Sequence, residues 1–426
     1  MTSTILLCTV GGSHKPILTA IAQARPDHVV FFATGPDPAT SRPGSLQQIL
    51  GKGTPVEERQ PDGQVRKLAN IPTLAGLAEG TYEAREVAAD DLDGAVSVIR
   101  ATLREVRASH PQAHFIADYT GGTKTMTGAL VIAALESEGV ELQLVTGARG
   151  DLIKVQDGSQ ARVAVETEGI RLRRAMEVYL GAWEAFNYAE AAAGLERLAH
   201  PSLPRDRYLR GDLQIARDLS RAFDAWDRFD HAAALPILEG YRARIGRNAG
   251  PLYIFLECLL ARDARQRPAR LWDLWLNAQR KGAQARYDDA VARLYRLTEG
   301  TAQWLLARRG IDTSALDPAH LPPDADLRPT RDGKYKAGLL DAWRLAAHHL
   351  GGEVAAFYAQ QGEPLRHHLW VRNASILAHG DQPIGPADWA GYSAWVEQHL
   401  LPLIAREAQA DGLRLHPPQL PRQPLW

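Results

Sequence analysis

A short stretch rich in glycine and threonine holds residue types that can bind an anion. It runs from Asp118 to Met126 and reads Asp-Tyr-Thr-Gly-Gly-Thr-Lys-Thr-Met. A short apolar run, His114 to Ala117, precedes it, and small apolar residues follow it as far as Leu135. This order predicts a buried strand, a glycine turn and a helix, an arrangement that presents backbone N–H groups to an anion. The glycines let a ligand approach the backbone, and the lysine adds a charge that suits phosphate.

Phosphate or nucleotide binding is one interpretation of this stretch, and a tight turn with a capping threonine is the other. The spacing of a Walker A loop is absent, and so is the dinucleotide fingerprint G-x-G-x-x-G, which argues against NAD. A second glycine loop follows an earlier apolar run, and its histidine either contacts the ligand or caps the next helix. The candidate ligand-binding residues of the two loops are Gly11, Gly12, Ser13, His14, Thr120, Gly121, Gly122, Thr123 and Lys124.

An arginine and a histidine near the end of the chain could cleave a phosphodiester. The segment from Pro364 to Ala378 is predicted to be one helix, and Arg372 and His379 are seven residues apart. Seven residues are about two helical turns, so we expect both side chains on one face, with Gly380 ending the helix as a left-handed cap. Arginine can hold a phosphate and histidine can move a proton, which are the parts of a metal-free RNA-cleaving site. The alternative is that Arg372 forms a surface ion pair and His379 assists the helix end.

Two histidine pairs, His348-His349 and His367-His368, could suggest a metal site. Adjacent helical residues diverge, and no Asp or Cys set at ligand spacing accompanies the pairs, so we expect no metal. The two cysteines, Cys8 and Cys258, lie far apart in apolar runs, which is typical of a reduced cytoplasmic protein.

The first part of the chain alternates apolar strands with helices. Strands are predicted at residues 4–10, 28–33, 82–87, 114–117 and 141–146, with helices at 45–50 and 92–109 among those between them. This alternation predicts a mostly parallel sheet with helices on both faces, and ligands bind such sheets where the strand order reverses. If the order reverses between the strands that precede the two glycine loops, both loops line one crevice. We expect an irregular insertion at 51–77 and a closing hairpin around Asp157-Gly158.

From Arg171 onward the pattern is almost wholly helical, with a break at Pro201–Pro204. The chain has 426 residues, a length that indicates two or three domains. It is 45% hydrophobic, which is enough for full cores. Its net charge of -1 provides no global basic field for nucleic acid, so any such contact must be local. No apolar stretch reaches the length of about 18 residues that a membrane span needs, and no signal peptide is expected.

These residues together resemble the CRISPR-associated CARF–HEPN ribonucleases, the ancillary effectors of type III systems. The CARF-like parts are VGGSHKPI, from Val10 to Ile17, and DYTGGTKTM, described above. The HEPN-like part is RNASILAHG, from Arg372 to Gly380, and YDDAVARLYRLTEGTAQWL, from Tyr287 to Leu305, looks like an opening helix of such domains. The resemblance implies a Rossmann-like CARF domain at 1–168, an all-α connector at 171–283 and an all-α HEPN domain at 284–426.

The resemblance also implies a function. A cyclic oligoadenylate, with tetra- or hexa-adenylate expected, would bind a CARF homodimer, and paired HEPN domains would then cut single-stranded RNA without metal. Arg372 would stabilise the pentacoordinate phosphate, His379 would act in proton transfer or orient the phosphate, and Asn373 would support the site. Some CARF domains also slowly cut their own activator, and the candidates for that reaction are Thr120, Thr123, Lys124 and His14.

Two other classes of protein remain as alternatives. A ligand-sensing regulator or scaffold with an inactive HEPN domain is possible, although the intact Arg372 and His379 argue against it. A CARF-controlled DNA nuclease would need a carboxylate cluster of the D…E-x-K type, and no strand carries one. We therefore expect no stable DNA binding.

Overall fold

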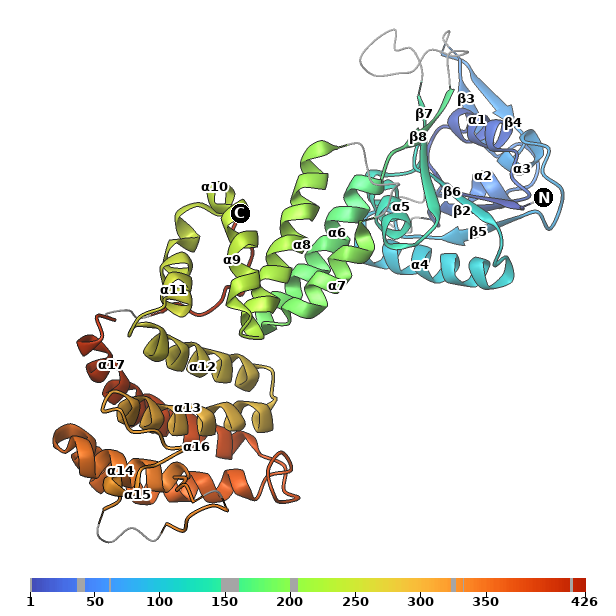
Figure 1. Ribbon diagram of the computed structural model, residues 1–426. Coiled ribbons are helices and arrows are strands. Elements are labelled where there is room, and N and C mark those ends of the chain that lie inside the picture. The colour runs from blue at the N-terminus through green and yellow to red at the C-terminus, as the bar shows by residue number, and fades with distance from the viewer. Residues whose placement is uncertain are drawn as a thin grey trace. The chain divides into compact units, whose positions relative to one another are not determined.

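The chain folds into two compact units, Met1–Leu172 and Arg173–Trp426 (Figure 1). The computed structural model describes residues 2–36, 43–60, 63–146, 161–199, 206–322, 327–331, 333–413 and 417–426. The expected hairpin turn at Asp157-Gly158 and the expected break at Pro201–Pro204 lie outside these residues.

The first unit is built on a six-stranded sheet with the order β5-β2-β1-β6-β7-β8. Its strands are β1 (Thr4–Val10), β2 (His28–Ala33), β5 (Tyr82–Glu86), β6 (His114–Asp118), β7 (Val140–Thr146) and β8 (Ala161–Val165). Every neighbouring pair is parallel except β7 and β8, which are antiparallel. The chain proceeds from β1 toward β2 and β5 on one side and continues from β6 toward β7 on the other. The order therefore reverses between β1 and β6, which is the condition for the two glycine loops to lie together.

Helices cover both faces of this sheet because its central strands are apolar on both sides. Ile5 and Leu7 of β1 pack with α4 (Leu92–Ser109) and α5 (Lys124–Glu136). Leu6 and Cys8 face the opposite side, where they pack with α1 (Lys15–Ala24). Side chains alternate between the faces of a strand, so a continuous apolar run serves two cores. The predicted mostly parallel sheet between helices is confirmed (Figure 1).

The segment 51–77 is more regular than expected. It contains an antiparallel pair, β3 (Val56–Arg59) and β4 (Val65–Leu68), followed by the short helix α3 (Ile71–Leu74). The prediction of an irregular insertion was wrong because polar, glycine-rich segments can still pair as strands through their backbones. Before it, α2 (Gln47–Leu50) is shorter than the helix predicted at 45–50.

The second unit consists of helices around one continuous hydrophobic core, which extends from Trp183 to Leu420. The helices are α6 (Glu168–Gly181, which begins in the first unit), α7 (Tyr188–Leu198), α8 (Arg207–Asp227), α9 (His231–Gly240), α10 (Arg242–Ile245), α11 (Gly250–Leu260), α12 (Gln266–Ala283), α13 (Tyr287–Ala307), α14 (Leu339–Leu350), α15 (Gly352–Asn373), α16 (Pro386–Trp395) and α17 (Leu401–Ala410). The predicted all-helical second part is confirmed. Across the described ranges, no helix combines the length and apolar character needed to cross a bilayer.

Candidate functional site

The two glycine loops of the first unit meet at the point where the strand order reverses. One loop follows β1 and the other follows β6, which are neighbours in the sheet. A Cβ atom on Gly11 would lie only 2.7 Å from the backbone nitrogen of Gly122, so the two loops are in contact. Gln48 also donates a hydrogen bond to the Gly11 carbonyl (2.8 Å). The structure thus brings together the candidates that the sequence placed more than a hundred residues apart.

The threonines of the second loop hold the loop in place. The Thr120 hydroxyl accepts a hydrogen bond from the Val145 N–H (2.7 Å). Thr123 is the N-cap of α5: its hydroxyl accepts from the Met126 N–H (3.2 Å) and donates to the Ala89 carbonyl (2.9 Å). These bonds indicate that the threonine hydroxyls hold a capped turn. The exposed parts of the loops remain available to a ligand.

Few of the candidate residues at the junction of the two loops are exposed. Gly12, Ser13 and Lys124 are exposed, and a Cβ atom on Gly12 would meet nothing within 4 Å. Lys124 is the first residue of α5, whose first turn contains no acidic side chain. A cation at a helix N-terminus is unfavourable by itself, since that end of the helix dipole is positive, but it adds to an anion-binding site. His14 is buried and caps α1 without a side-chain hydrogen bond, and burial lowers its pKa.

A buried carboxylate, Asp118, fastens this loop to the sheet, and the sequence did not single it out. Its side chain accepts hydrogen bonds from the Thr120 N–H (3.0 Å) and the Gln143 amide (2.9 Å). Burial raises the pKa of Asp118, and these hydrogen bonds act in the opposite direction. The signal that could have identified it is its place at the end of an apolar strand immediately before the glycine turn.

The second candidate site lies at the end of α15, and here the predicted helix was wrong. The helix begins at Gly352, contains Pro364 in its interior and ends at Asn373, so Arg372 is helical and His379 is not. An interior proline costs about 3 kcal/mol or more. Packing outweighs that cost here because the helix buries apolar side chains on both sides of the proline, including Phe357 and Leu365.

A compact loop, and not a shared helix face, returns His379 to the helix end. The His379 N–H donates to the Asn373 carbonyl (3.3 Å), and the Gly380 N–H donates to the Ser375 carbonyl (3.2 Å). Gly380 is not in the left-handed region, so it is not the predicted cap. It is needed for space, because a Cβ atom there would lie 2.1 Å from the Ala374 carbonyl oxygen.

The Arg372 side chain lies on the ring of Tyr295, a residue of α13. Its guanidinium carbon is 4.2 Å from the ring centroid, and its Nη1 donates to the Asn373 Oδ1 (3.0 Å). Burial and the nearby Glu299 raise the pKa of Tyr295, while Arg372 lowers it. A guanidinium stacked on an aromatic face is held in one orientation with its outer N–H groups available. Sequence reasoning singled out the helix that carries Tyr295 but missed this contact.

The histidines near this site differ in environment. His379 is exposed, whereas His368 of α15 is stacked on Tyr392, with ring centroids 4.5 Å apart. Burial and the neighbouring His367 lower the pKa of His368 to about 4, so it is neutral near neutral pH. Within the part of the chain that the structure describes, no three His, Cys, Asp or Glu side chains gather as metal ligands.

Three large apolar side chains in or next to this motif in the sequence are exposed. Trp370 is 69% exposed, Ile376 63% and Leu377 57%, and all three flank or belong to the segment from Arg372 to Gly380. Exposed apolar groups gathered at one place are typical of a protein–protein contact.

Comparisons with known proteins agree with this architecture. The sequence profile of the family described as the Csm6 HEPN domain matches residues 261–400, which include Arg372, Asn373 and His379. No curated protein matches the chain.

Among solved structures, Enterococcus italicus Csm6 bound to cyclic hexa-2'-fluoro-hexa-dAMP matches with a TM-score of 0.50 and 10% identity, covering 95% of each chain. This likeness is one of fold. A type III CRISPR defence DNA nuclease activated by cyclic oligoadenylate has a TM-score of 0.25 and 14% identity, covering 61% of this chain and 33% of its own. Can2 from Sulfobacillus thermosulfidooxidans, in complex with cyclic tetra-adenylate, has a TM-score of 0.24 and 13% identity, covering 55% of this chain and 68% of its own. The HEPN profile confirms the HEPN resemblance over residues 261–400, and the first structure shows a similar fold along almost the whole chain.

Proposed function

We propose, from the premise that this chain is a CARF–HEPN protein of the CRISPR-associated kind, that it is an RNA-cutting enzyme switched on by a cyclic oligoadenylate. Its substrate would be single-stranded RNA, cut without metal during type III antiviral defence. The observation that carries the proposal is the juxtaposition at the end of α15, where the loop returns His379 to Asn373 beside the stacked Arg372.

The proposed chemistry uses the RNA's own 2′-hydroxyl as the nucleophile. It attacks the adjacent phosphorus, the bond to the 5′-oxygen of the next nucleotide breaks, and a cyclic phosphate and a 5′-hydroxyl result. Arg372, oriented by Tyr295 and Asn373, would hold the charge that develops on the phosphate oxygens. His379, exposed on its loop, would transfer a proton or orient the phosphate.

The activator would bind at the junction of the two glycine loops. The two loops meet at the strand-order reversal, where ligands bind sheets of this kind, and Lys124 is exposed at the N-terminus of α5. The Enterococcus italicus protein of similar fold binds a cyclic hexa-adenylate analogue, which supports a cyclic oligonucleotide. Of the nine candidates, Gly12, Ser13 and Lys124 would make direct contact, whereas Thr120 and Thr123 would shape the loop.

A two-fold homodimer would complete both sites. The exposed Trp370, Ile376 and Leu377 would pack against a second copy, which brings two Arg372–His379 pairs to one composite active site. A symmetric interface also suits an even-membered ring, because each protomer would contact an equivalent half of the tetra- or hexa-adenylate.

The proposal is tested by incubating single-stranded RNA with the protein and a panel of cyclic oligoadenylates. We expect cleavage only with one ring size, and we expect it to continue in excess EDTA. Cleavage that stops with EDTA and returns with magnesium would contradict the HEPN mechanism. Binding of a ring without any cleavage would indicate an inactive sensor.

Lys124→Ala is expected to raise the activator concentration for half-maximal RNA cleavage at least tenfold. A charge-assisted contact is worth about 1.5–3 kcal/mol, roughly ten- to hundredfold in affinity, and a dimer would lose two. The rate at saturating activator should change little, because Lys124 belongs to the first unit. Lys67→Ala, which removes an exposed lysine from β4, is the matched control. An unchanged midpoint and unchanged ring binding would leave Lys124 as a residue of a structural turn.

Gly12→Val tests whether the activator approaches the backbone of the first glycine loop, without changing the shape of that loop. Its Cβ enters open space, so the fold should persist while the activator midpoint rises. Gly122→Val cannot make this distinction. Gly122 has a φ of +95°, and its Cβ would lie 2.8 Å from the Thr9 Cβ, so that variant would damage the loop itself.

A further inference from the structure

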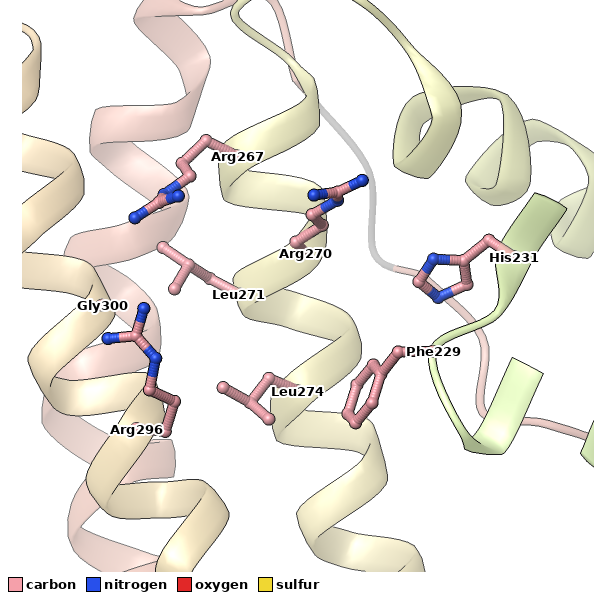
Figure 2. A pocket seen from close by; sticks show the side chains of 8 residues that line it. All are labelled: Phe229, His231, Arg267, Arg270, Leu271, Leu274, Arg296 and Gly300. Atoms are coloured by element: carbon pink, nitrogen blue, oxygen red, sulfur yellow. The ribbon is translucent and has the colours of Figure 1, made fainter. Parts of the chain in front are cut away.

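A basic cavity of about 340 Å³ lies in the second unit, outside the end of α15 (Figure 2). Three segments build it: the connection between α8 and α9, the helix α12 and the helix α13. Its lining includes Phe229, Arg267, Arg270, Leu271, Leu274 and Arg296. The cavity therefore combines three guanidinium groups with an apolar floor and one aromatic ring.

The three arginines of this cavity have fewer acidic partners than positive charges. In Figure 2, Arg267 of α12 and Arg296 of α13 extend toward one another beside Leu271. Burial and the charges of Arg296 and Arg270 lower the pKa of Arg267. Glu299 pairs with Arg296 (2.8 Å), but Arg267 and Arg270 have no acidic partner among the residues that the structure describes. Like charges held together in this way favour a bound anion.

The aromatic ring is presented by an unusual backbone. Phe229 has a φ of +64°, in the region that disfavours side chains, and it is 40% exposed. Next to it, His231 also lines the cavity and is fixed by Asp273 (2.8 Å), which also accepts from the Trp226 indole (3.0 Å). The ring thus stands at the cavity on a rigid support. An exposed aromatic face beside arginines is the combination that binds a base and its phosphate.

One helix connects this cavity to the proposed active site. Tyr295 of α13 supports Arg372, and the next residue, Arg296, lines the cavity. Consecutive helical residues point about 100° apart, so the two sites occupy adjacent flanks of α13. Tyr295 interacts electrostatically with both arginines. An RNA strand that runs across α13 from Arg372 would therefore reach Arg296 next.

We propose that this cavity binds one nucleotide unit of the single-stranded RNA substrate, away from the bond that is cut. Arg267 and Arg270 contact the backbone phosphate, and the base stacks on Phe229. The inference rests on the proposed function, because it takes RNA as the substrate. A free nucleotide has the same chemistry, and the experiment distinguishes the two sources.

The test is binding of a fluorescent single-stranded RNA whose 2′-hydroxyls are methylated, so that the proposed chemistry cannot cut it. The full-length Arg267→Ala/Arg270→Ala variant should bind this probe at least about tenfold more weakly than wild type, since each phosphate contact is worth about tenfold. The slope of log affinity against log salt should fall by about 0.7, since the two arginines contact one phosphate and each neutralised phosphate of a single strand contributes about 0.7. The matched control is Arg247→Ala/Arg309→Ala, which removes two exposed arginines elsewhere in the same unit.

Phe229→Gly tests the stacking contact without straining the fold. Glycine accepts a φ of +64°, so the unfolding temperature should stay near the wild-type value while RNA affinity falls by about tenfold. Affinity and salt slope equal to the control for both variants, in a protein that still binds and cuts RNA, would overturn the cavity assignment alone. Wild-type protein that neither binds nor cuts RNA would overturn the proposed function as well. Tight binding of adenosine monophosphate that depends on Arg267 and Arg270, with RNA binding unaffected, would assign the cavity to a free nucleotide instead.

Discussion

Arg372→Ala and His379→Ala should each reduce activator-dependent RNA cleavage by at least a hundredfold. Losing a positioned donor to developing charge costs about 10²–10³ in rate, and losing a general acid or base costs about 10²–10⁴. The fold should persist, because His379 is exposed and Arg372 stands at a helix end on the surface of the Tyr295 ring. The measurements are single-turnover RNA cleavage and direct binding of the cyclic oligoadenylate, which should remain unchanged.

Two neighbours on α15 provide matched controls for these variants. Arg366 and His367 are exposed on the same helix, so Arg366→Ala and His367→Ala remove the same groups close to the site. Both controls should retain cleavage near the wild-type rate. Equal losses in the controls and in the site variants would mean that the end of α15 is sensitive as a structure, and that Arg372 and His379 have no chemical role.

The composite site can be tested with mixtures of wild-type and Arg372→Ala protomers. If heterodimers are inactive because the two protomers share one site, the activity after subunit exchange should fall as the square of the wild-type fraction. A linear fall would indicate that each protomer cuts RNA independently. Sedimentation at the assay concentration should show a dimer, and a fully active monomer would contradict the proposed homodimer.

Gly380→Ala should abolish cleavage as completely as loss of Arg372, although it leaves both reactive side chains present. The added Cβ would lie 2.1 Å from the Ala374 carbonyl oxygen, and backbone cannot move aside as a flexible side chain can. The loop that returns His379 to Asn373 would therefore open. It is held by backbone bonds from the Ile376 N–H to the Gln382 carbonyl (3.1 Å) and from the Gln382 N–H to the Ala374 carbonyl (3.1 Å).

Gly391→Ala is the control for this glycine variant. Gly391 lies in α16, where a new Cβ would meet nothing within 4 Å. Alanine is favoured over glycine in a helix interior by about 1 kcal/mol, so this control should be active and equally or more stable. If Gly380→Ala cleaves RNA at the wild-type rate, the loop geometry described for the motif is not the geometry used in catalysis.

Local pattern was sufficient for much of the first unit. Apolar runs such as Thr4–Val10 and the amphipathic segment Leu92–Ser109 became the predicted strand and helix, because their periodicity matches one kind of buried surface. The mostly parallel sheet follows from this alternation, whereas the order of its strands comes from the folded chain. The hairpin within 51–77 was missed because pairing between polar strands leaves little hydrophobic signal.

For the site at the end of α15, the candidate residues can be read from the sequence, whereas their geometry depends on how the chain folds. The order Arg372, Asn373 and His379 is legible in the chain, but a helical spacing does not say where the helix ends. It ends at Asn373, and the following residues bond among themselves, with Gly380 fitting closely against the Ala374 carbonyl.

Contacts between distant segments were beyond sequence reasoning for the same physical reason. Tyr295 lies under Arg372 because α13 and α15 pack in one core, and the cavity at Phe229 draws its arginines from two helices. Likewise Thr120 and Thr123, which look like ligand hydroxyls in the sequence, bond to Val145 and Ala89 once the chain is folded. Residue type and periodicity are local properties, whereas the partner of a side chain is set by which surfaces the whole chain buries together.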